Sequence, residues 1–173
     1  MASRDSAVID SMVAYLADVI EKPHPAFGGM PICPFSRQAR LANQILYCIY
    51  PFSCADLTTK TPLLQIIDDF QQSPQYEILL VIHPDYSGLS LDATHQFVQQ
   101  LNQAIAAQNL IAFDGHPQDD FNIQGVYTRK APFIHLTVQH LSKVKAASDQ
   151  LHHTPYYKGW TAEQLSYVGL PRE

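Results

Sequence analysis

YEILLVI, residues 76–82, is a nearly unbroken apolar run of strand length. Runs of this kind are typical of a central strand that is covered on both faces. The tripeptide His83-Pro84-Asp85 ends it, because proline and aspartate both disfavour a continuing strand. The segment therefore predicts the middle of a sheet with other elements packed on both sides.

The residues around this segment predict helices that alternate with short strands. A first amphipathic helix is expected over residues 8–20, capped by Asp5 or Ser6, and Thr61 and Ser90 are expected to cap two later helices. The other predicted elements are strands over 44–50, 110–113 and 133–138 and a helix over 141–151. This order predicts an α/β (α+β) fold, a single layered domain over residues 1–173, with one mixed sheet of about four or five strands and flanking helices.

Composition restricts the class of function. The chain has 173 residues, of which 46% are apolar, so it is long enough to bury a core. A net charge of −5 without a run of Lys or Arg argues against nucleic acid and against anionic membranes as partners. A polar N-terminus and an odd number of cysteines, 3, favour a cytoplasmic protein without a signal peptide. We expect a small-molecule substrate, and a homodimer remains open.

HPAFGGMPICPFSR, residues 24–37, is the segment where we expect the site. Its glycines and prolines set the backbone by local stereochemistry rather than by hydrophobic periodicity. Because Pro34 suits the first position of a helix, Cys33 is expected at the N-cap, where the helix dipole, Arg37 and Arg40 would favour the thiolate. Cys33 is thus a candidate nucleophile or a ligand of a metal or heme; the alternative is a buried small hydrophobe.

Two histidines and an arginine are further candidates. His24 is a candidate acid/base or ligand, although it could equally cap a turn. His116 follows the end of a predicted strand, where side chains tend to project into clefts, and Arg129 precedes the last strand, where it suits a carboxylate or propionate. The alternatives are a solvated histidine and a charged loop. We expect Cys33, His116 and Arg129 to meet in one cavity, and His135 to be a satisfied core residue.

Three segments carry a resemblance to known families. HPAFGGMPICPF, then GHP, then TRKAPFIHL resemble the ordered HP…PxCPF, FHP-type and RSPxP-type boxes of uncharacterised bacterial domain families. The CPF box is also similar to the cysteine box of the YqcI/YcgG family, whose studied members are heme-dependent enzymes that oxidise nitrogen in amino and guanidino substrates. The chain departs from the pattern at Gly115 and at Lys130-Ala131. The matching residues are His24, Cys33, Pro34, Phe35, His116, Pro117, Arg129 and Pro132.

The resemblance implies heme as the cofactor and Cys33 as its axial metal ligand. Arg129 or Arg37 would then hold a propionate, and His116 or His24 would lie on the distal side. The expected activity is that of a heme-thiolate oxygenase or oxidase, a monooxygenase-type enzyme acting on a small nitrogen-containing compound. Two alternatives stay open: a heme- or ligand-binding sensor or carrier without turnover, and a heme-free enzyme that uses Cys33 as nucleophile with a histidine base.

Overall fold

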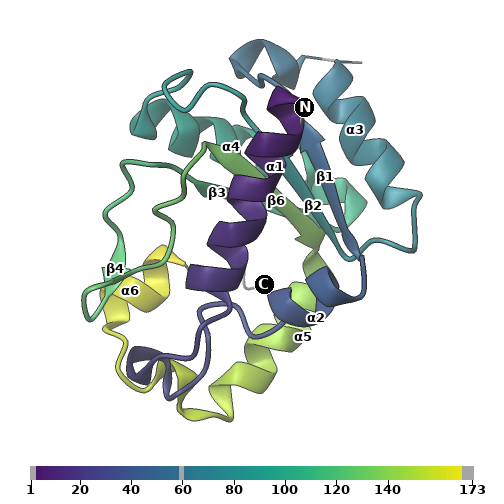
Figure 1. Cartoon of the computed structure of the whole chain (residues 1–173). Coiled ribbons are helices and arrows are strands. Elements are labelled where there is room, and N and C mark those ends of the chain that lie inside the picture. The colour runs from purple at the N-terminus through teal and green to yellow at the C-terminus, as the bar shows by residue number, and fades with distance from the viewer. Residues whose placement is uncertain (1–2, 59–60, 169–173) are drawn as a thin grey trace.

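The computed structural model describes residues 3–58 and 61–168. Its centre is a mixed four-stranded sheet in the order β1-β2-β6-β3 (Figure 1). Strand β1 runs parallel to β2, and β6 runs antiparallel to both of its neighbours. The predicted α+β class with one mixed sheet is thereby confirmed. The strands are β1 (Ile45–Ile49), β2 (Ile78–Ile82), β3 (Leu110–Gly115) and β6 (His135–His140).

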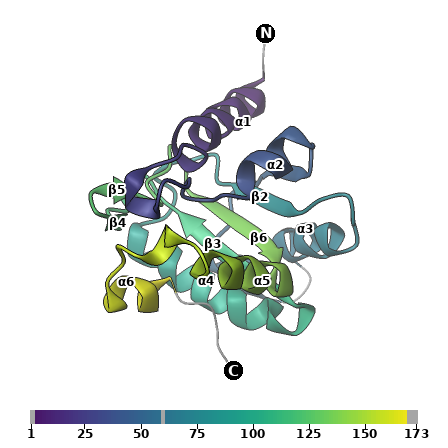
Figure 2. The same ribbon diagram turned by 90° about the horizontal axis from the view of Figure 1, so that it is seen from below.

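Strand β2 is buried along its whole length, as its composition predicted. Leu79 and Val81 face a core formed with α3 (Pro62–Gln71) and α4 (Leu91–Ile105). The alternate residues of the strand, Ile78, Leu80 and Ile82, face a second core formed with α1 (Arg4–Tyr15). Figure 2 shows α1 and α2 on one side of the sheet and α4 on the other. The domain therefore has helical layers on both faces of a single sheet.

Most predicted helices are present, with differences at their ends. Thr61 and Ser90 cap α3 and α4 as expected, each accepting a backbone N–H with its hydroxyl oxygen. The first helix begins earlier, at Arg4, because Ser3 is the capping residue and accepts the N–H of Ser6. It continues past α1 as a π-helical turn, Leu16–Ile20. Within the described residues, no helix is long and apolar enough to cross a membrane.

Two elements of the structure lie in segments where no helix or strand was predicted. A small hairpin, β4 (Asn122–Ile123) and β5 (Val126–Tyr127), turns at Gln124 and Gly125, both of which have positive φ. Helix α6 (Ala162–Tyr167) follows the predicted helix α5 (Leu141–His152). Side chains of the hairpin and of the C-terminal region form a third apolar cluster with the segment around Phe27. This cluster joins the segment around Phe27 to the hairpin and to the C-terminal region.

A buried ion pair joins the end of the first helical segment to α2 (Ser36–Leu41). Glu21 is 8% exposed, and its carboxylate accepts two close bonds from Arg40, from Nε at 2.9 Å and from Nη2 at 2.8 Å. The hydroxyl of Ser36 donates to the same carboxylate at 3.3 Å. Both ends of the intervening loop, which carries Cys33, are therefore fixed to each other.

We expect Arg40→Met to lower the free energy of unfolding by ~2–3 kcal/mol, because the change leaves the buried Glu21 carboxylate without its cation. Chemical denaturation measures this loss. Arg37→Met is the matched control, because Arg37 lies on the same helix and is exposed. The control should change stability by less than about 0.5 kcal/mol. Equal losses in the two variants would mean that the ion pair contributes nothing specific.

Candidate functional site

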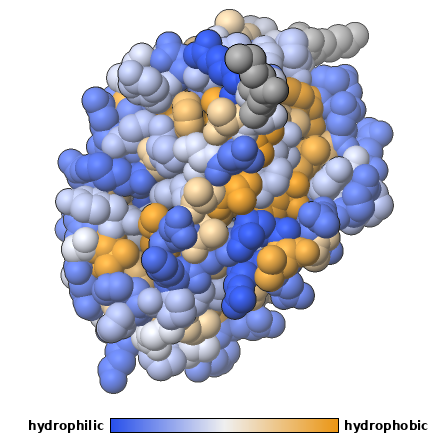
Figure 3. Space-filling view, in the orientation of Figure 1, coloured by the Kyte–Doolittle hydropathy of each residue, from blue (hydrophilic) through white to orange (hydrophobic). Residues whose placement is uncertain are grey.

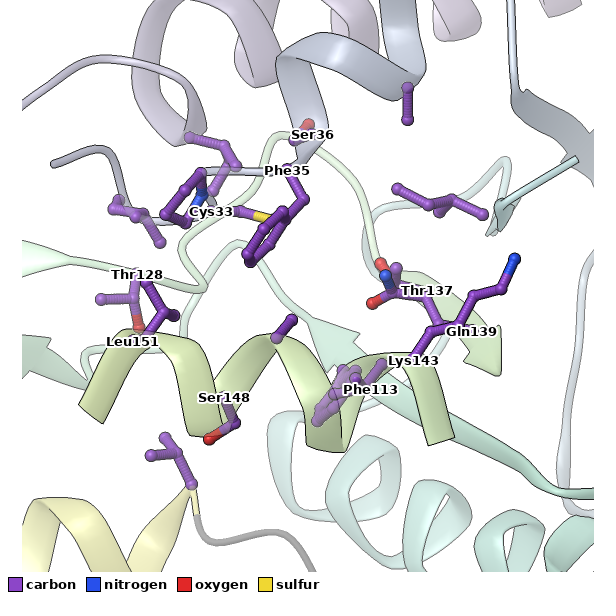
Figure 4. Close-up of a pocket in the computed structure, with 18 of the residues that line it drawn as sticks. Cys33, Phe35, Ser36, Phe113, Thr128, Thr137, Gln139, Lys143, Ser148 and Leu151 are labelled. Atoms are coloured by element: carbon purple, nitrogen blue, oxygen red, sulfur yellow. The ribbon is translucent and has the colours of Figure 1, made fainter. Parts of the chain in front are cut away.

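A cavity of about 2010 Å³ lies between one face of the sheet, the loop that carries Cys33 and helix α5. Pockets for small molecules are usually ~300–1,000 Å³, so this space is large for a ligand site. Figure 4 shows Cys33 and Phe35 above, Ser148 and Leu151 of α5 below, and Thr137 and Gln139 of β6 at the right. On the face seen in Figure 3, apolar atoms gather beside α1 and are surrounded by hydrophilic residues.

The floor of the cavity is a polar strip of β6. Side chains of a strand alternate between the two faces, and Leu136 and Val138 are fully buried in the core under α3 and α4. His135, Thr137 and Gln139 consequently face the other side, where they line the cavity. A central strand is thus apolar on one face and polar on the other, and the polar face is the one left open to a ligand.

Cys33 lines this cavity but does not cap a helix. Helix α2 begins at Ser36, and its N-cap is Phe35. The prediction that Cys33 occupies the N-cap is therefore wrong. Pro34 lies in a turn before the helix, where the N–H of Ser36 donates to the Cys33 carbonyl at 3.4 Å, while the N–H of Cys33 donates to the carbonyl of Ile20 at 3.2 Å.

The environment of Cys33 favours the thiol over the thiolate, contrary to the expectation from sequence. Burial raises the pKa of the Cys33 thiol, and the nearby charge of Glu21 raises it further. Backbone N–H groups of Phe35 and Ser36 lower this pKa, but they do not outweigh burial. Arg40 forms an ion pair with Glu21. Arg37 is exposed and is not among the residues that line the cavity, so neither arginine activates the sulfur.

The two histidines expected on the distal side of a heme have structural roles instead. His24 caps the short turn at Pro25, where its Nδ1 accepts the N–H of Ala26 at 3.0 Å. His116 is 2% exposed; its Nε2 donates to the Leu89 carbonyl at 2.9 Å, and its Nδ1 accepts the N–H of Gln118 at 3.0 Å. Neither residue belongs to the cavity lining in the described chain. The turn-capping alternative for His24 is the one observed.

Arg129 does line the cavity and is held at the sheet edge. Its Nη1 lies 3.5 Å from Oδ1 of Asp114, and its guanidinium lies over the rings of Phe121 and Tyr167, 5.7 and 5.2 Å from their centroids. Of the three residues expected to meet, Cys33 and Arg129 therefore share one cavity and His116 does not. A backbone hydrogen bond links His116 to Arg129: the His116 N–H donates to the Arg129 carbonyl at 3.0 Å.

A polar cluster that was not predicted lies beside Arg129. Asp114 and Asp119 are 8% and 3% exposed, and Nε2 of His95 lies 3.5 Å from Oδ2 of the former and 3.3 Å from Oδ2 of the latter. The signal available in the sequence was the density of acidic residues in the DGHPQDD segment, 114–120, directly after a strand. His135 is buried and hydrogen-bonded to the Phe133 carbonyl, as expected, but it also lines the cavity, which was not predicted.

We expect Cys54 to be alkylated by iodoacetamide well before Cys33. The thiolate is the reacting form, and the raised pKa of Cys33 keeps its thiol protonated until the pH exceeds the ordinary range of cysteine. Cys54 is exposed, whereas Cys48 lies in β1 and burial raises its pKa as well. Mass spectrometry of peptides after a pH series measures the order of modification. Fast labelling of Cys33 near neutral pH would contradict this account.

The described residues contain no group of three or more His, Cys, Asp or Glu side chains that could hold a metal ion. Any metal at Cys33 would therefore have this sulfur as its main protein ligand. Comparisons of the chain with models of protein families, with curated proteins and with solved structures find no match in any of the three.

Proposed function

We propose that the protein binds heme in this cavity, with Cys33 as the axial ligand of the iron. The observation that carries the proposal is the position of the Cys33 sulfur in a large cavity, beside the ring of Phe35 (Figure 4). A porphyrin supplies its own equatorial ligands, so a heme needs one protein ligand rather than a cluster of three or four. A single cysteine in a broad cavity fits that requirement better than it fits a protein-coordinated metal ion.

The walls of the cavity also fit a heme. Aromatic and aliphatic side chains suit the faces of a porphyrin, and examples here are Phe35, Phe113 and Leu151. Cations suit its propionates, and the lining includes Arg129 and Lys143. Lys143 is 60% exposed, and its ammonium lies 2.7 Å from a Glu77 carboxylate oxygen. A propionate would therefore compete with Glu77 for this ammonium group. Such exposed pairs are weak, and competition costs little.

Oxidation of a small nitrogen-containing compound is the reaction we propose for the heme-loaded protein. A bound heme would supply the redox chemistry, and the support for this substrate class is the resemblance of the CPF box. A sensor or carrier would use the same cavity and the same sulfur. The third alternative, Cys33 as a nucleophile, is less well supported, because burial raises the pKa of this thiol and neither His24 nor His116 lies in the cavity.

Hemin titration tests the binding proposal. We expect wild-type protein to give a shifted Soret band and a ferrous–CO spectrum of thiolate type, and Cys33→Ser to lose the thiolate spectrum because its hydroxyl is a poor ligand for iron. Binding should strengthen as the pH rises, since the thiol must lose its proton when the iron binds. Cys54→Ser is the control, because Cys54 is exposed. An identical spectrum in wild type and Cys33→Ser would remove Cys33 as the ligand.

Arg129→Lys tests whether this guanidinium holds a propionate. We expect hemin binding to weaken by ~1–3 kcal/mol, because an ammonium cannot form the bidentate bond of a guanidinium. Lys130→Ala is the neighbouring control, since Lys130 pairs with Asp120 at the surface, 2.8 Å away. Hemin affinity of the control should stay within about twofold of wild type. Equal affinities of wild type and Arg129→Lys would place the propionates elsewhere, for example near Lys143.

A further inference from the structure

One of the 8 histidines of the chain is both buried and part of the cavity wall. Four histidines line the cavity, and three of them are not buried: His152 and His153 are exposed, and His140 is half-buried and stacks on Phe70 at 5.5 Å. His135 is the fourth, and it is 7% exposed. It lies at the start of β6.

The ring of His135 is oriented so that one nitrogen is free. Its Nδ1 lies 3.2 Å from the carbonyl oxygen of Phe133, and because a carbonyl only accepts, Nδ1 carries the hydrogen. Nε2 is then an acceptor, and it has no hydrogen-bond partner among residues 3–58 and 61–168. The ring packs on Gly115, where an added Cβ would lie 2.0 Å from its Cε1. Burial lowers the pKa of His135, which keeps the ring neutral near neutral pH.

The neighbouring Asp114 faces the other side of the sheet. It pairs with Leu136 across β3 and β6, and residues that pair directly share a face, so its carboxylate lies with Leu136 on the α4 side. There Nε2 of His95, a residue of α4, lies 3.5 Å from Oδ2, and Nη1 of Arg129 lies 3.5 Å from Oδ1. His135 is therefore the buried acceptor on the cavity face of this strand pair.

We propose that His135 Nε2 is the acceptor of a polar subsite that takes a hydrogen bond from an N–H or O–H group of a planar, largely apolar ligand. The ring is carried by β6, which pairs with β2 and β3, so the position of the acceptor is set before a ligand arrives. Phe113 and the apolar side chains of the lining provide the surface for the rest of the ligand. The inference rests on the cavity being a ligand site, as in the proposed function, but it does not require iron.

A matched pair of probes tests this subsite in the protein without heme. The probes are 2-naphthol and 2-methoxynaphthalene, which share an aromatic body and differ in the O–H donor. Binding is followed by the fluorescence of Trp160, which is the single tryptophan and lines the cavity. We expect wild-type protein to bind 2-naphthol roughly three- to tenfold more tightly, which is the size of one hydrogen bond.

His135→Leu should bring the two affinities to within about twofold of each other, because it removes the acceptor and keeps an apolar side chain. His83→Leu is the control, since His83 is also 7% exposed but does not line the cavity. This control should keep the preference of wild type. Equal affinity of wild type for the two probes, no binding of either, or a preference that survives in His135→Leu would overturn the subsite.

Nitrogen NMR of the wild-type histidine rings decides the question even if His135→Leu does not fold. The Nε2 resonance of His135 should shift on addition of 2-naphthol and much less with 2-methoxynaphthalene. A shift confined to other histidines would overturn the proposal. The hemin titration is a separate readout. Protein that takes up hemin but shows no preference for 2-naphthol would support the proposed function and contradict the subsite. Protein that prefers 2-naphthol but takes up no hemin would support the subsite and contradict heme binding.

Discussion

The alternation of side chains along β6 is the constraint on which the site depends. Leu136 and Val138 must face α3 and α4, because the core on that side closes around them. A strand has a period of two residues, so His135, Thr137 and Gln139 are forced onto the opposite face. A shift of register by one residue would bury the polar side chains and expose the apolar ones. The polar floor of the cavity is therefore a consequence of the core packing behind it.

The position of Cys33 depends on a different interaction. Glu21 ends the first helical segment and binds Arg40 and Ser36 of α2, so the loop between them is held over the sheet. Burial of the sulfur is the main cause of the raised pKa of the Cys33 thiol, and the charge of the nearby Glu21 carboxylate adds to it. The ion pair thus positions the sulfur in surroundings that keep it protonated. A metal that displaces the proton can use such a thiol, whereas a nucleophile at neutral pH needs the thiolate.

The sequence predicted the parts of the fold that local patterns control. The apolar run of β2 and the caps Thr61 and Ser90 depend on neighbouring residues alone, and all were found. The start of α2 was misjudged because Pro34 is compatible with either a first helical residue or a turn, and the contact that decides is Glu21 with Ser36, 15 residues apart. Whether His135 faced a core or a cavity depended on its pairing with β2 and β3, which sequence periodicity does not define.

The sulfur and the His135 acceptor of the cavity differ in how firmly they are held. His135 lies on β6, which is paired on both sides within the sheet. Cys33 lies on a loop that is fixed by the Glu21 ion pair and by Tyr156, whose hydroxyl donates to the carbonyl of Ile32. Because Tyr156 belongs to the third apolar cluster, around Phe27, a ligand that contacts Cys33 and displaces this loop must also act on that cluster. The cavity therefore couples the C-terminal region to the cysteine loop, while His135 on the sheet remains a fixed reference for the ligand.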